Sequence, residues 1–324
     1  MTQDTVLITG GCGFLGAKLA HMLLDREPGR SIVLTDIVES PRLEPLMDAV
    51  TFIQGDLSDR QFCLDLVTGH VSTVFHLASL VSGGAERDFE AGMKVNLYAT
   101  LHLLEACRFQ GKTPRFVFAS SIATFGGRGL PDEVNDWTYQ HPQNSYGVAK
   151  VIGEQLLNDY SRKGFVDGRG VRLPAVVVRD VPNTAMSGYV SNMIREPLSG
   201  KDYVCPVGPE TRIPIMSAGK AVELFLCLGD LPGEVLGDYR TLNGPGISPT
   251  AGETADTVRR LAPAGCHVGE IRFASDPVMQ GIIDSWPKVM RAERANALGL
   301  PSDDSIESLV LDYVHMSVDR SHKS

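Results

Sequence analysis

The sequence predicts an α/β fold with a doubly wound parallel sheet and a smaller, loop-rich C-terminal part. In the first half of the chain, short apolar segments alternate with longer amphipathic ones. The apolar segments are hydrophobic on both faces, which is typical of parallel strands covered by helices on each side. Strands and helices in alternation, joined by right-handed crossovers, give a doubly wound sheet. After about residue 175, Pro, Gly and polar residues become frequent, which predicts the loop-rich part.

The expected elements follow one another in a regular order. The apolar segments predict strands at residues 5–10, 31–36, 51–56, 72–79, 114–121 and 168–179. Helical spacing of apolar residues predicts helices at 14–25, 92–111, 144–160, 188–198, 217–230 and 248–263. A glycine and then a proline follow the second of these helices, which is a usual stop signal.

This order divides the chain into two expected units. Residues 1–175 are predicted to form a dinucleotide-binding domain, to which residues 212–245 return. Residues 176–211 and 246–324 are predicted to form a substrate-binding part that packs over the end of the first domain. A chain of 324 residues is long enough for two such units.

The composition excludes several classes of function. A net charge of −9 argues against nucleic acid as a partner, because phosphate binding needs a basic surface. No apolar stretch reaches the ~18 residues of a membrane span, and the N-terminus lacks the features of a signal peptide. The six cysteines are scattered and form no zinc or redox motif, which favours free thiols and no metal site. We therefore expect a cytoplasmic protein without a membrane partner.

A glycine motif near the N-terminus predicts a dinucleotide site. Gly10, Gly13 and Gly16 form the pattern Gly-x-x-Gly-x-x-Gly between an expected strand and an expected helix. Glycine allows a tight turn and a close approach of the pyrophosphate, and the helix N-terminus then holds the anion. The strand, the helix and an acidic residue 20 positions after Gly16 agree with this context.

Two aspartates at strand ends complete the expected cofactor site. Asp36 is that acidic residue, and its carboxylate can accept hydrogen bonds from a ribose while repelling a 2′-phosphate. No Arg follows Asp36 directly, so NAD is favoured over NADP. Asp56 is positioned to meet the adenine amino group, and a turn or helix N-cap aspartate is an equally good interpretation of it.

A serine, a tyrosine and a lysine in the middle of the chain carry a family resemblance. Tyr146 and Lys150 lie four residues apart at the start of an expected helix, and Ser121 ends an expected strand 25 residues before Tyr146. With the glycine motif, the segments "HLAS", "KVNLYAT", "SSIATFGG" and "SYGVAK" resemble the extended short-chain dehydrogenase/reductase family in order and separation.

This resemblance implies the roles of several residues. Ser121, Tyr146 and Lys150 match the catalytic set of the family, and Asn96 matches the asparagine that supports it. Further contacts to NAD are implied for Phe14, Leu15, Leu57, Ala78, Ser79 and Pro174, besides the glycines, the aspartates, Asn96, Tyr146 and Lys150. A free tyrosine titrates near ~10, and a neighbouring ammonium such as Lys150 stabilises its phenolate and lowers that pKa. Tyr146 can then act as a general base toward an alcohol that Ser121 orients.

A narrower resemblance concerns the substrate. The segments "HLASLVSGGAERDFEAGMKVN", "NDYSRKGFVDGRGVRLPAVVVR", "MIREPLSG" and "DSWPKVMRAERANALGL" are similar to the D-erythronate dehydrogenase group. This implies oxidation of the C2 hydroxyl of a four-carbon sugar acid to the 2-oxo acid. That group usually continues its sixth strand with Arg-Pro-Gly, whereas this chain has Asp180 and Val181 after Arg179, which leaves the identity of the acid open.

Substrate contacts are expected from Ser121, Tyr146 and an arginine. A sugar carboxylate needs a cation, and a guanidinium offers two parallel hydrogen bonds. Arg179, at the carboxyl edge of the sheet, is the first candidate and Arg195 the second, while a surface or ion-pair arginine is the alternative for each. His76 ends an expected strand against the cofactor and is interpreted as a packed histidine.

Other functions remain open at this point. The main alternative is a sugar-nucleotide epimerase or dehydratase that keeps its NAD bound, because one fold hosts several reactions. An NAD-binding regulator is a third reading, although both Tyr146 and Lys150 are present. A homodimer through the amphipathic stretches 92–110 and 147–160 is a further expectation, with packing inside one chain as its alternative.

Overall fold

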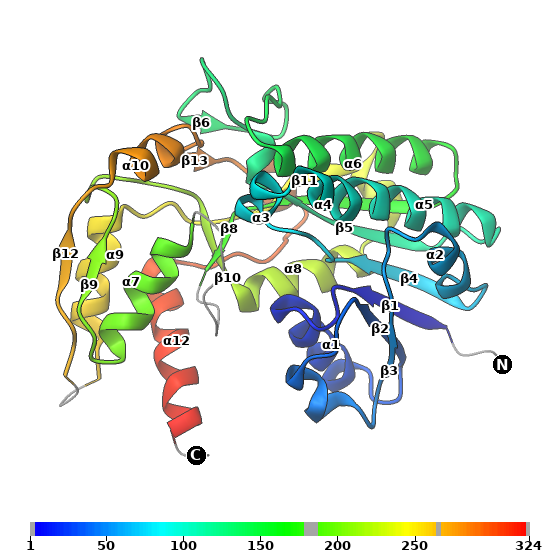
Figure 1. Cartoon of the computed structure of the whole chain (residues 1–324), viewed down its shortest axis with the longest axis horizontal. Helices are drawn as coiled ribbons and strands as arrows, with labels where there is room; N and C mark the ends of the chain where they lie inside the picture. Colours follow the sequence, from blue (N-terminus) through cyan, green and yellow to red (C-terminus); the bar gives the residue numbers. More distant parts are fainter. Residues whose placement is uncertain (1–3, 178–186, 264–266, 322–324) are drawn as a thin grey trace.

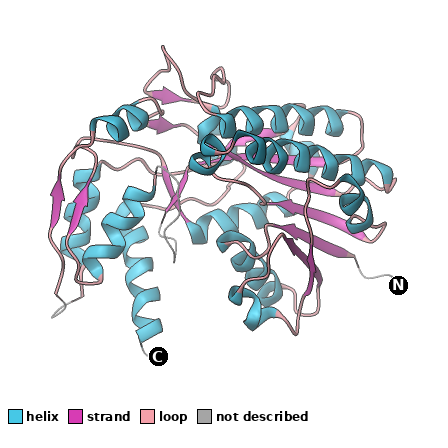
Figure 2. Cartoon of the chain, viewed as in Figure 1, coloured by secondary structure: helices cyan, strands magenta, loops and turns pink. Residues whose placement is uncertain are grey.

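The computed structural model describes residues 4–177, 187–263 and 267–321. A seven-stranded sheet forms its larger part, and a smaller group of helices and short strands lies beside the sheet (Figures 1 and 2). The doubly wound α/β fold predicted from the sequence is confirmed.

The strands of the main sheet are all parallel to their neighbours. Their order is β3-β2-β1-β4-β5-β7-β11, so the chain reverses its direction of travel between β1 and β4. Ligands of open α/β sheets bind outside the carboxyl ends of the strands at this point. The strands are β1 (Thr5–Thr9), β2 (Ser31–Asp36), β3 (Thr51–Gln54), β4 (Val71–His76), β5 (Arg115–Ser121), β7 (Asp167–Leu173) and β11 (Thr241–Asn243).

Helices cover both faces of this sheet, because successive strand residues point to opposite sides. Val6 and Ile8 of β1 belong to one hydrophobic cluster, while Leu7 between them belongs to another. The first cluster includes α1 (Phe14–Arg26) and α8 (Ala218–Asp230), and the second includes α2 (Arg60–Leu66), α5 (Ala99–Phe109) and α6 (Ser145–Arg162). Figure 1 shows α5 and α6 side by side above the sheet.

The helix expected at 92–111 is interrupted. The chain forms α4 (Phe89–Met93), a π-helical turn η2 (Lys94–Tyr98) and then α5. Such π turns are rare in proteins, and those that occur are often found at functional sites. Here the turn carries Asn96, whose side chain is buried and bonds to the loop after β4.

The prediction of a single strand at 168–179 is wrong. β7 ends at Leu173, and β8 (Ala175–Val177) pairs instead with β10 (Ile215–Ser217) in a separate two-stranded sheet. Pro174 lies between them, and a proline has no N–H to continue the ladder. The last two residues of the expected strand lie outside the described residues.

The smaller part has its own hydrophobic cluster. Figure 1 shows its helices at the side of the main sheet toward which the strands point, with the C-terminus at the end of α12. Its elements are α7 (Gly188–Leu198), β9 (Tyr203–Cys205), α9 (Ala251–Leu261), β12 (Ile271–Phe273), α10 (Pro277–Asp284) and α12 (Ile306–Ser321), and β9 pairs with β12. None of the helices within the described ranges is long and apolar enough to cross a membrane.

Short elements fill the remaining connections. β6 (Glu133–Val134) pairs with β13 (Val289–Met290), so the C-terminal segment crosses back to the loop before α6. The others are η1 (Pro41–Leu46), α3 (Ser82–Arg87), η3 (Ile122–Thr124), η4 (Gly233–Leu236) and α11 (Glu293–Ala297).

Candidate cofactor and active site

One cleft at the carboxyl ends of β1, β4 and β5 brings together most of the predicted site residues. Its volume is about 260 Å³. The predicted residues along its wall are Gly10, Gly13, Phe14, Leu15, Gly16, Ser79, Ser121, Tyr146, Lys150 and Pro174. These residues come from five segments that are far apart in the sequence, so the sheet edge is what assembles them.

The glycine loop between β1 and α1 has the geometry of a phosphate cradle. Gly10 adopts a left-handed conformation, with φ of 68°. A Cβ atom at Gly16 would lie 2.2 Å from the carbonyl oxygen of Gly10, so only glycine lets α1 start this close to the loop. The α1 N-terminus has no side-chain cap and no acidic residue in its first turn. These features fit the pyrophosphate of a dinucleotide, which the helix N-terminus would hold.

Asp36 ends β2 beside this loop. Its carboxylate accepts hydrogen bonds from the backbone N–H of Cys12, at 3.1 Å, and of Ile37, at 2.9 Å. Burial raises the pKa of Asp36, and these two N–H donors oppose that shift. Asp36 thus ties the second strand to the glycine loop, and the same carboxylate is the predicted acceptor for a ribose.

Asp56 lies two residues beyond the end of β3 and forms a turn. Its Oδ1 accepts a hydrogen bond from the Ser58 N–H at 2.8 Å. The helix that follows is capped by Asp59, whose carboxylate accepts from Gln61 and Phe62. Leu57 is buried against α2 and α5. The turn interpretation of Asp56 therefore describes its observed contacts.

Asn96 fixes the loop that follows β4. Its Nδ2 donates to the Leu80 carbonyl at 2.9 Å, and its Oδ1 accepts from the Leu80 N–H at 2.9 Å and from Ser79 Oγ at 3.0 Å. Ser79 lines the cleft, and the backbone of Ala78 packs directly against Gly10. The bonds of Asn96 therefore go to the cleft wall, where they hold Ser79 in place.

His76 is a packed histidine, as its position predicts. Its two ring nitrogens lie 2.8 Å from Thr9 Oγ1 and 2.9 Å from Thr100 Oγ1. Burial, and then the charge of Lys150, lower the pKa of His76 to about 3. The imidazole is therefore neutral at physiological pH and links β1, β4 and α5 beneath the cleft.

Ser121, Tyr146 and Lys150 meet in the cleft because α6 starts very close to the end of β5. A Cβ atom at Gly147 would lie 2.1 Å from the Ala123 carbonyl oxygen, so glycine is required there. Asn144 caps α6 by accepting a hydrogen bond from the Gly147 N–H at 2.8 Å. This cap fixes the start of the helix that carries Tyr146 and Lys150 on one face.

Lys150 is a buried lysine beside the Tyr146 ring. Its side chain is 2% exposed, and Nζ lies 5.5 Å from the centre of the Tyr146 ring and 4.8 Å from that of Phe118. Burial lowers the pKa of Lys150 to about 7, and the nearby Glu154 carboxylate opposes that shift. A lysine that titrates near neutral pH next to a tyrosine in a cleft is typical of a proton-transfer site.

The wall of the cleft also contains residues that the sequence did not single out individually. Val81 and Ser82 come from the start of α3, Ser187 from the start of α7, and Trp286 from the segment after α10. Ser82 and Trp286 lie in two of the segments that resemble the D-erythronate dehydrogenase group, so that resemblance could have pointed to them. No pattern marks Ser187.

The first predicted arginine, Arg179, lies outside the described residues, as do Asp180 and Val181. The second, Arg195, is not among the described residues that line the cleft. Arg195 is on α7, where Nε donates to Glu196 at 3.0 Å and Nη2 donates to Asn192 at 2.5 Å. Among the described lining residues, Lys150 carries the only cationic side chain.

The cleft contains a glycine loop, a buried lysine and a tyrosine at the carboxyl ends of the strands. This combination is typical of Rossmann-fold enzymes that use a nicotinamide dinucleotide as cofactor. Residues 6–231 match the NAD dependent epimerase/dehydratase family, and the chain belongs to this family. The family membership confirms the predicted extended short-chain dehydrogenase type and the predicted NAD cofactor.

Individual relatives narrow the comparison. The chain is 44% identical to D-erythronate dehydrogenase of Cupriavidus necator, over 95% of this chain and 97% of that protein. It is 37% identical to D-erythronate dehydrogenase of Haemophilus influenzae, over 95% and 98%. A solved structure, the nucleoside-diphosphate-sugar epimerase from Agrobacterium tumefaciens, is similar with a TM-score of 0.89 and 35% identity, over 97% of this chain and 94% of that one. The first two relatives support the dehydrogenase prediction over the epimerase alternative.

Proposed function

We propose that this protein is an NAD-dependent dehydrogenase that oxidises the C2 hydroxyl of a small sugar acid, similar to D-erythronate, to the 2-oxo acid. The observation that carries the proposal is the cleft in which Ser121, Tyr146 and Lys150 lie beside the glycine loop. Two D-erythronate dehydrogenases that match along most of the chain supply the substrate class.

The proposed roles follow from the chemistry of each side chain. Tyr146, as phenolate, removes the proton of the substrate hydroxyl, and the Lys150 ammonium stabilises that phenolate. Ser121 orients the hydroxyl by a hydrogen bond. When bound, NAD supplies the hydride acceptor for the same carbon. Gly10, Gly13 and Gly16, with the first turn of α1, would hold its pyrophosphate, and Asp36 its ribose.

The polar groups of the cleft suit a small hydroxylated acid. Five serines line it: Ser79, Ser82, Ser120, Ser121 and Ser187. A hydroxyl can donate and accept, as polyol recognition requires, although those of Ser79 and Ser120 already donate to Asn96 and Glu154. For the carboxylate we propose Arg179, which follows β8 in the sequence, and Arg195 as the second candidate.

The test of the proposal is NAD reduction across a panel of C4 to C6 sugar acids, including both enantiomers of erythronate and threonate. Free NADH should accumulate with one of the four-carbon acids. The control is the neutral polyol of the same length and stereochemistry, which should react far more slowly. Equal oxidation of acid and polyol would refute the sugar-acid proposal. Tight retention of NAD without net NADH would instead support the epimerase alternative, which regenerates its cofactor.

An arginine variant identifies the carboxylate site in the same assay. Losing a charge-assisted pair typically costs on the order of 2–3 kcal/mol, so Arg179→Met should lower kcat/KM for the acid by roughly 30- to 150-fold. Arg179→Lys should recover only part of the loss, because an ammonium cannot form two parallel hydrogen bonds. Arg195→Met is the comparison, and the residue whose loss removes the preference for acid over polyol is the carboxylate ligand.

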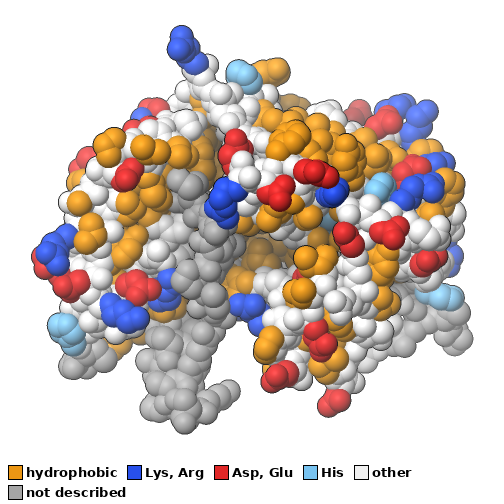
Figure 3. Space-filling model, in the orientation of Figure 1, with side chains coloured by type: hydrophobic (Ala, Val, Ile, Leu, Met, Phe, Trp, Pro, Cys, Tyr) orange, Lys and Arg blue, Asp and Glu red, His pale blue; other side chains and the backbone are white. Residues whose placement is uncertain are grey.

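Assembly, unit boundaries and location are further parts of the proposal. We propose that residues 1–175 with 212–245 hold the cofactor, and that 176–211 with 246–324 hold the substrate. A homodimer is supported by apolar side chains exposed on α4, η2, α5 and α6, namely Phe89, Tyr98, Phe109, Val148 and Ile152, which are 37–63% exposed. Figure 3 shows hydrophobic side chains gathered over these helices. Sedimentation of the wild type and of Ile152→Glu tests the dimer.

The proposed location of the protein is the cytoplasm. Fractionation of cells that contain the native protein tests this location.

A further inference from the structure

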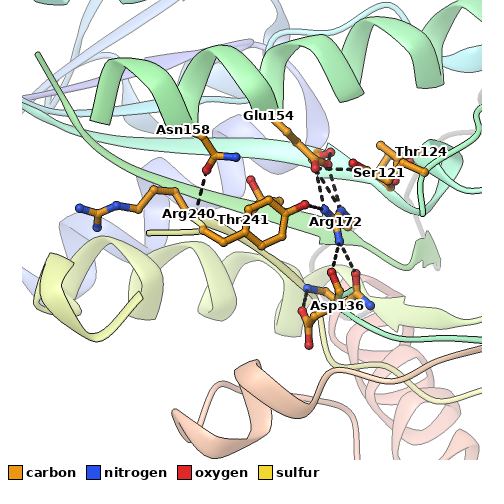
Figure 4. A network of polar contacts seen from close by, with 12 residues as sticks. Ser121, Thr124, Asp136, Glu154, Asn158, Arg172, Arg240 and Thr241 are labelled. Atoms are coloured by element: carbon orange, nitrogen blue, oxygen red, sulfur yellow. Dashed lines mark hydrogen bonds and ion pairs between the residues drawn. The ribbon is translucent and has the colours of Figure 1, made fainter. Parts of the chain in front are cut away.

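A buried ion pair lies directly behind the cleft. Glu154 of α6 and Arg172 of β7 both have no exposed side-chain surface, and Arg172 Nη2 donates to Glu154 Oε2 at 2.8 Å. Figure 4 shows the two side chains pointing toward each other between the helix and the sheet. No part of the proposed reaction has used either residue.

Glu154 continues the row of side chains that enters the cleft. Tyr146, Lys150 and Glu154 are spaced four residues apart on α6, so they lie on one side of the helix. Glu154 Oε1 accepts a hydrogen bond from Ser120 Oγ, and Ser120 immediately precedes Ser121 at the end of β5. The same carboxylate therefore contacts the strand end that presents Ser121 and lies one helical turn from Lys150.

Arg172 connects this carboxylate to two other segments, the loop at Asp136 and the stretch from Tyr239 to Asn243. Its Nη1 donates to the Asp136 carbonyl at 3.3 Å and to Asn243 Oδ1 at 3.2 Å, and its Nη2 also donates to Tyr239. Asn243 in turn donates from its side chain to the Arg291 carbonyl at 2.9 Å. The network thus reaches the C-terminal segment that begins just after Trp286 in the cleft.

A buried ion pair is an unusual way to stabilise a fold. Burying two charges is costly, and apolar residues of similar volume often stabilise a protein as well or better. The pair lies between Ser120 and the turn of α6 that carries Lys150, so a role in the active site is a better explanation of its position. The chain contains a second buried arginine for comparison, Arg169 of β7, which pairs with Asp167 away from the cleft.

We propose that Glu154, held in place by Arg172, is a positioning residue for proton transfer: it fixes the end of β5 through Ser120 and supports the charge of the Lys150 ammonium. This inference rests on the proposed roles of Ser121, Tyr146 and Lys150. Glu154 does not line the cleft, so it acts through its neighbours and not on the substrate.

The electrostatic part of the proposal has a definite sign. The groups facing Lys150 are Tyr146 and Glu154 on its own helix and His76 on β4, which is neutral, while Arg172 on β7 faces Glu154. Burial lowers the pKa of Lys150 to about 7, and Glu154 opposes this. Removing the charge of Glu154 leaves Arg172 unpaired, so both changes lower the pKa of Lys150 further. The ammonium should then be lost at lower pH.

The pH profile of the reaction tests this sign. With the wild type, kcat/KM should fall at alkaline pH as Lys150 loses its proton. Glu154→Gln keeps the shape of the side chain, removes its charge and leaves one amide oxygen to accept hydrogen bonds. We expect the alkaline limb to move down by about one pH unit and kcat/KM at pH 8 to fall roughly tenfold, since one pKa unit is a factor of ten in protonation. The variant Glu154→Gln/Arg172→Met removes both charges and should return the limb toward that of the wild type.

A matched variant separates this effect from loss of packing. Asp167→Asn removes the carboxylate partner of the other buried arginine, so it should lower the stability without moving the alkaline limb. A Glu154→Gln protein with activity reduced by one factor at every pH would overturn the proposal, because that pattern indicates a purely structural role. If Glu154→Gln does not fold, the double variant decides: a limb at the wild-type pH supports charge compensation, and a limb displaced downward contradicts it.

A second measurement does not depend on the substrate. The pKa of Lys150 can be read from NMR of the lysine side chains, with the signal assigned by its loss in Lys150→Met. It should be lower in Glu154→Gln than in the wild type and unchanged in Asp167→Asn. An unchanged value in Glu154→Gln overturns the proposal. A lower value in a protein that oxidises no sugar acid upholds the charge coupling and refutes only the proposed substrate.

Discussion

The two ends of the cleft are built by different means. One part of the wall, here called the cofactor end, comes from the glycine loop and the first turn of α1. Another part, here called the substrate end, comes from Val81, Ser187 and Trp286, which lie more than 90 residues apart in the sequence. Tyr146 and Lys150 also line the cleft.

This difference has a physical reason. A pyrophosphate is recognised by N–H groups and a helix dipole, which any sequence provides once glycine lets the chain adopt the right shape. A small acid is recognised by the position and type of individual side chains, which can change without altering the fold. We therefore expect the cofactor end to be sensitive to an added methyl group, and the substrate end to depend on which side chain is present.

The largest effect is expected at Tyr146. Tyr146→Phe removes the proposed base and should lower kcat by at least ~100-fold, as is typical of general-base catalysis. NAD affinity and the KM for the acid should stay near those of the wild type, because neither end has changed. Tyr139→Phe is the control, since Tyr139 is 84% exposed. Turnover of Tyr146→Phe at the wild-type rate would refute the assigned base.

A single methyl group tests the backbone character of the cofactor end. In Gly16→Ala the new Cβ would lie 2.2 Å from the Gly10 carbonyl oxygen, so α1 must shift away from the loop. Overpacking of this kind costs about 1–3 kcal/mol, and we expect NAD to bind roughly 30-fold more weakly by calorimetry. Gly69→Ala is the matched control, because its Cβ meets no described atom within 4 Å. Unchanged affinity in Gly16→Ala would show that the loop is more adaptable than its contacts suggest.

Sequence patterns captured the cofactor end because its constraints repeat locally. Gly10, Gly13, Gly16 and Asp36 follow from a strand, a turn and a helix that succeed one another in the chain. The spacing of Tyr146 and Lys150 is likewise visible, because a helix brings positions four apart onto one side. Family membership has since confirmed the fold and NAD, while the individual site residues stay predictions until they are changed.

Other features depend on contacts that the sequence does not display. The π turn carries Asn96, whose side chain bonds to the loop after β4, 16 residues away in the sequence. Glu154 and Arg172 resemble ordinary surface charges in the sequence, and only the fold shows them to be buried together. Pro174 could have predicted the break between β7 and β8, but the apolar residues on both sides of it favoured the prediction of a single strand.

The substrate end should respond to loss of a side chain. Trp286→Ala removes a large part of the wall, and the lost apolar contact should raise the KM for the acid roughly fivefold. NAD affinity should not change. Trp137, the other tryptophan of the chain, is 71% exposed, so Trp137→Ala is a matched control. If Trp286→Ala weakened NAD and left the KM for the acid unaltered, the two ends would have been assigned the wrong way round.

The smallest effect concerns acid stability beneath the cofactor end. The folded protein holds His76 with a pKa lowered to about 3, from 6.5, because the ring is buried. Between these two values the unfolded chain binds a proton that the folded protein does not. The free energy of unfolding should therefore decrease as the pH falls below 6.5, by about 1.4 kcal/mol per pH unit from this group. Urea unfolding of the wild type between pH 5.5 and pH 4.5, where the unfolded histidine is almost fully protonated, measures that slope.

Replacing the histidine isolates its share of the slope. His76→Asn should be less stable at neutral pH, because one of the two bonds to Thr9 and Thr100 is lost. Its stability should nevertheless fall less steeply with acid, since the side chain no longer titrates. His141→Asn, at an exposed histidine, should keep the wild-type slope. Equal slopes in His76→Asn and the wild type would mean that other groups cause the acid sensitivity. In that case a neutral, buried His76 would not be the reason that the protein loses stability in acid.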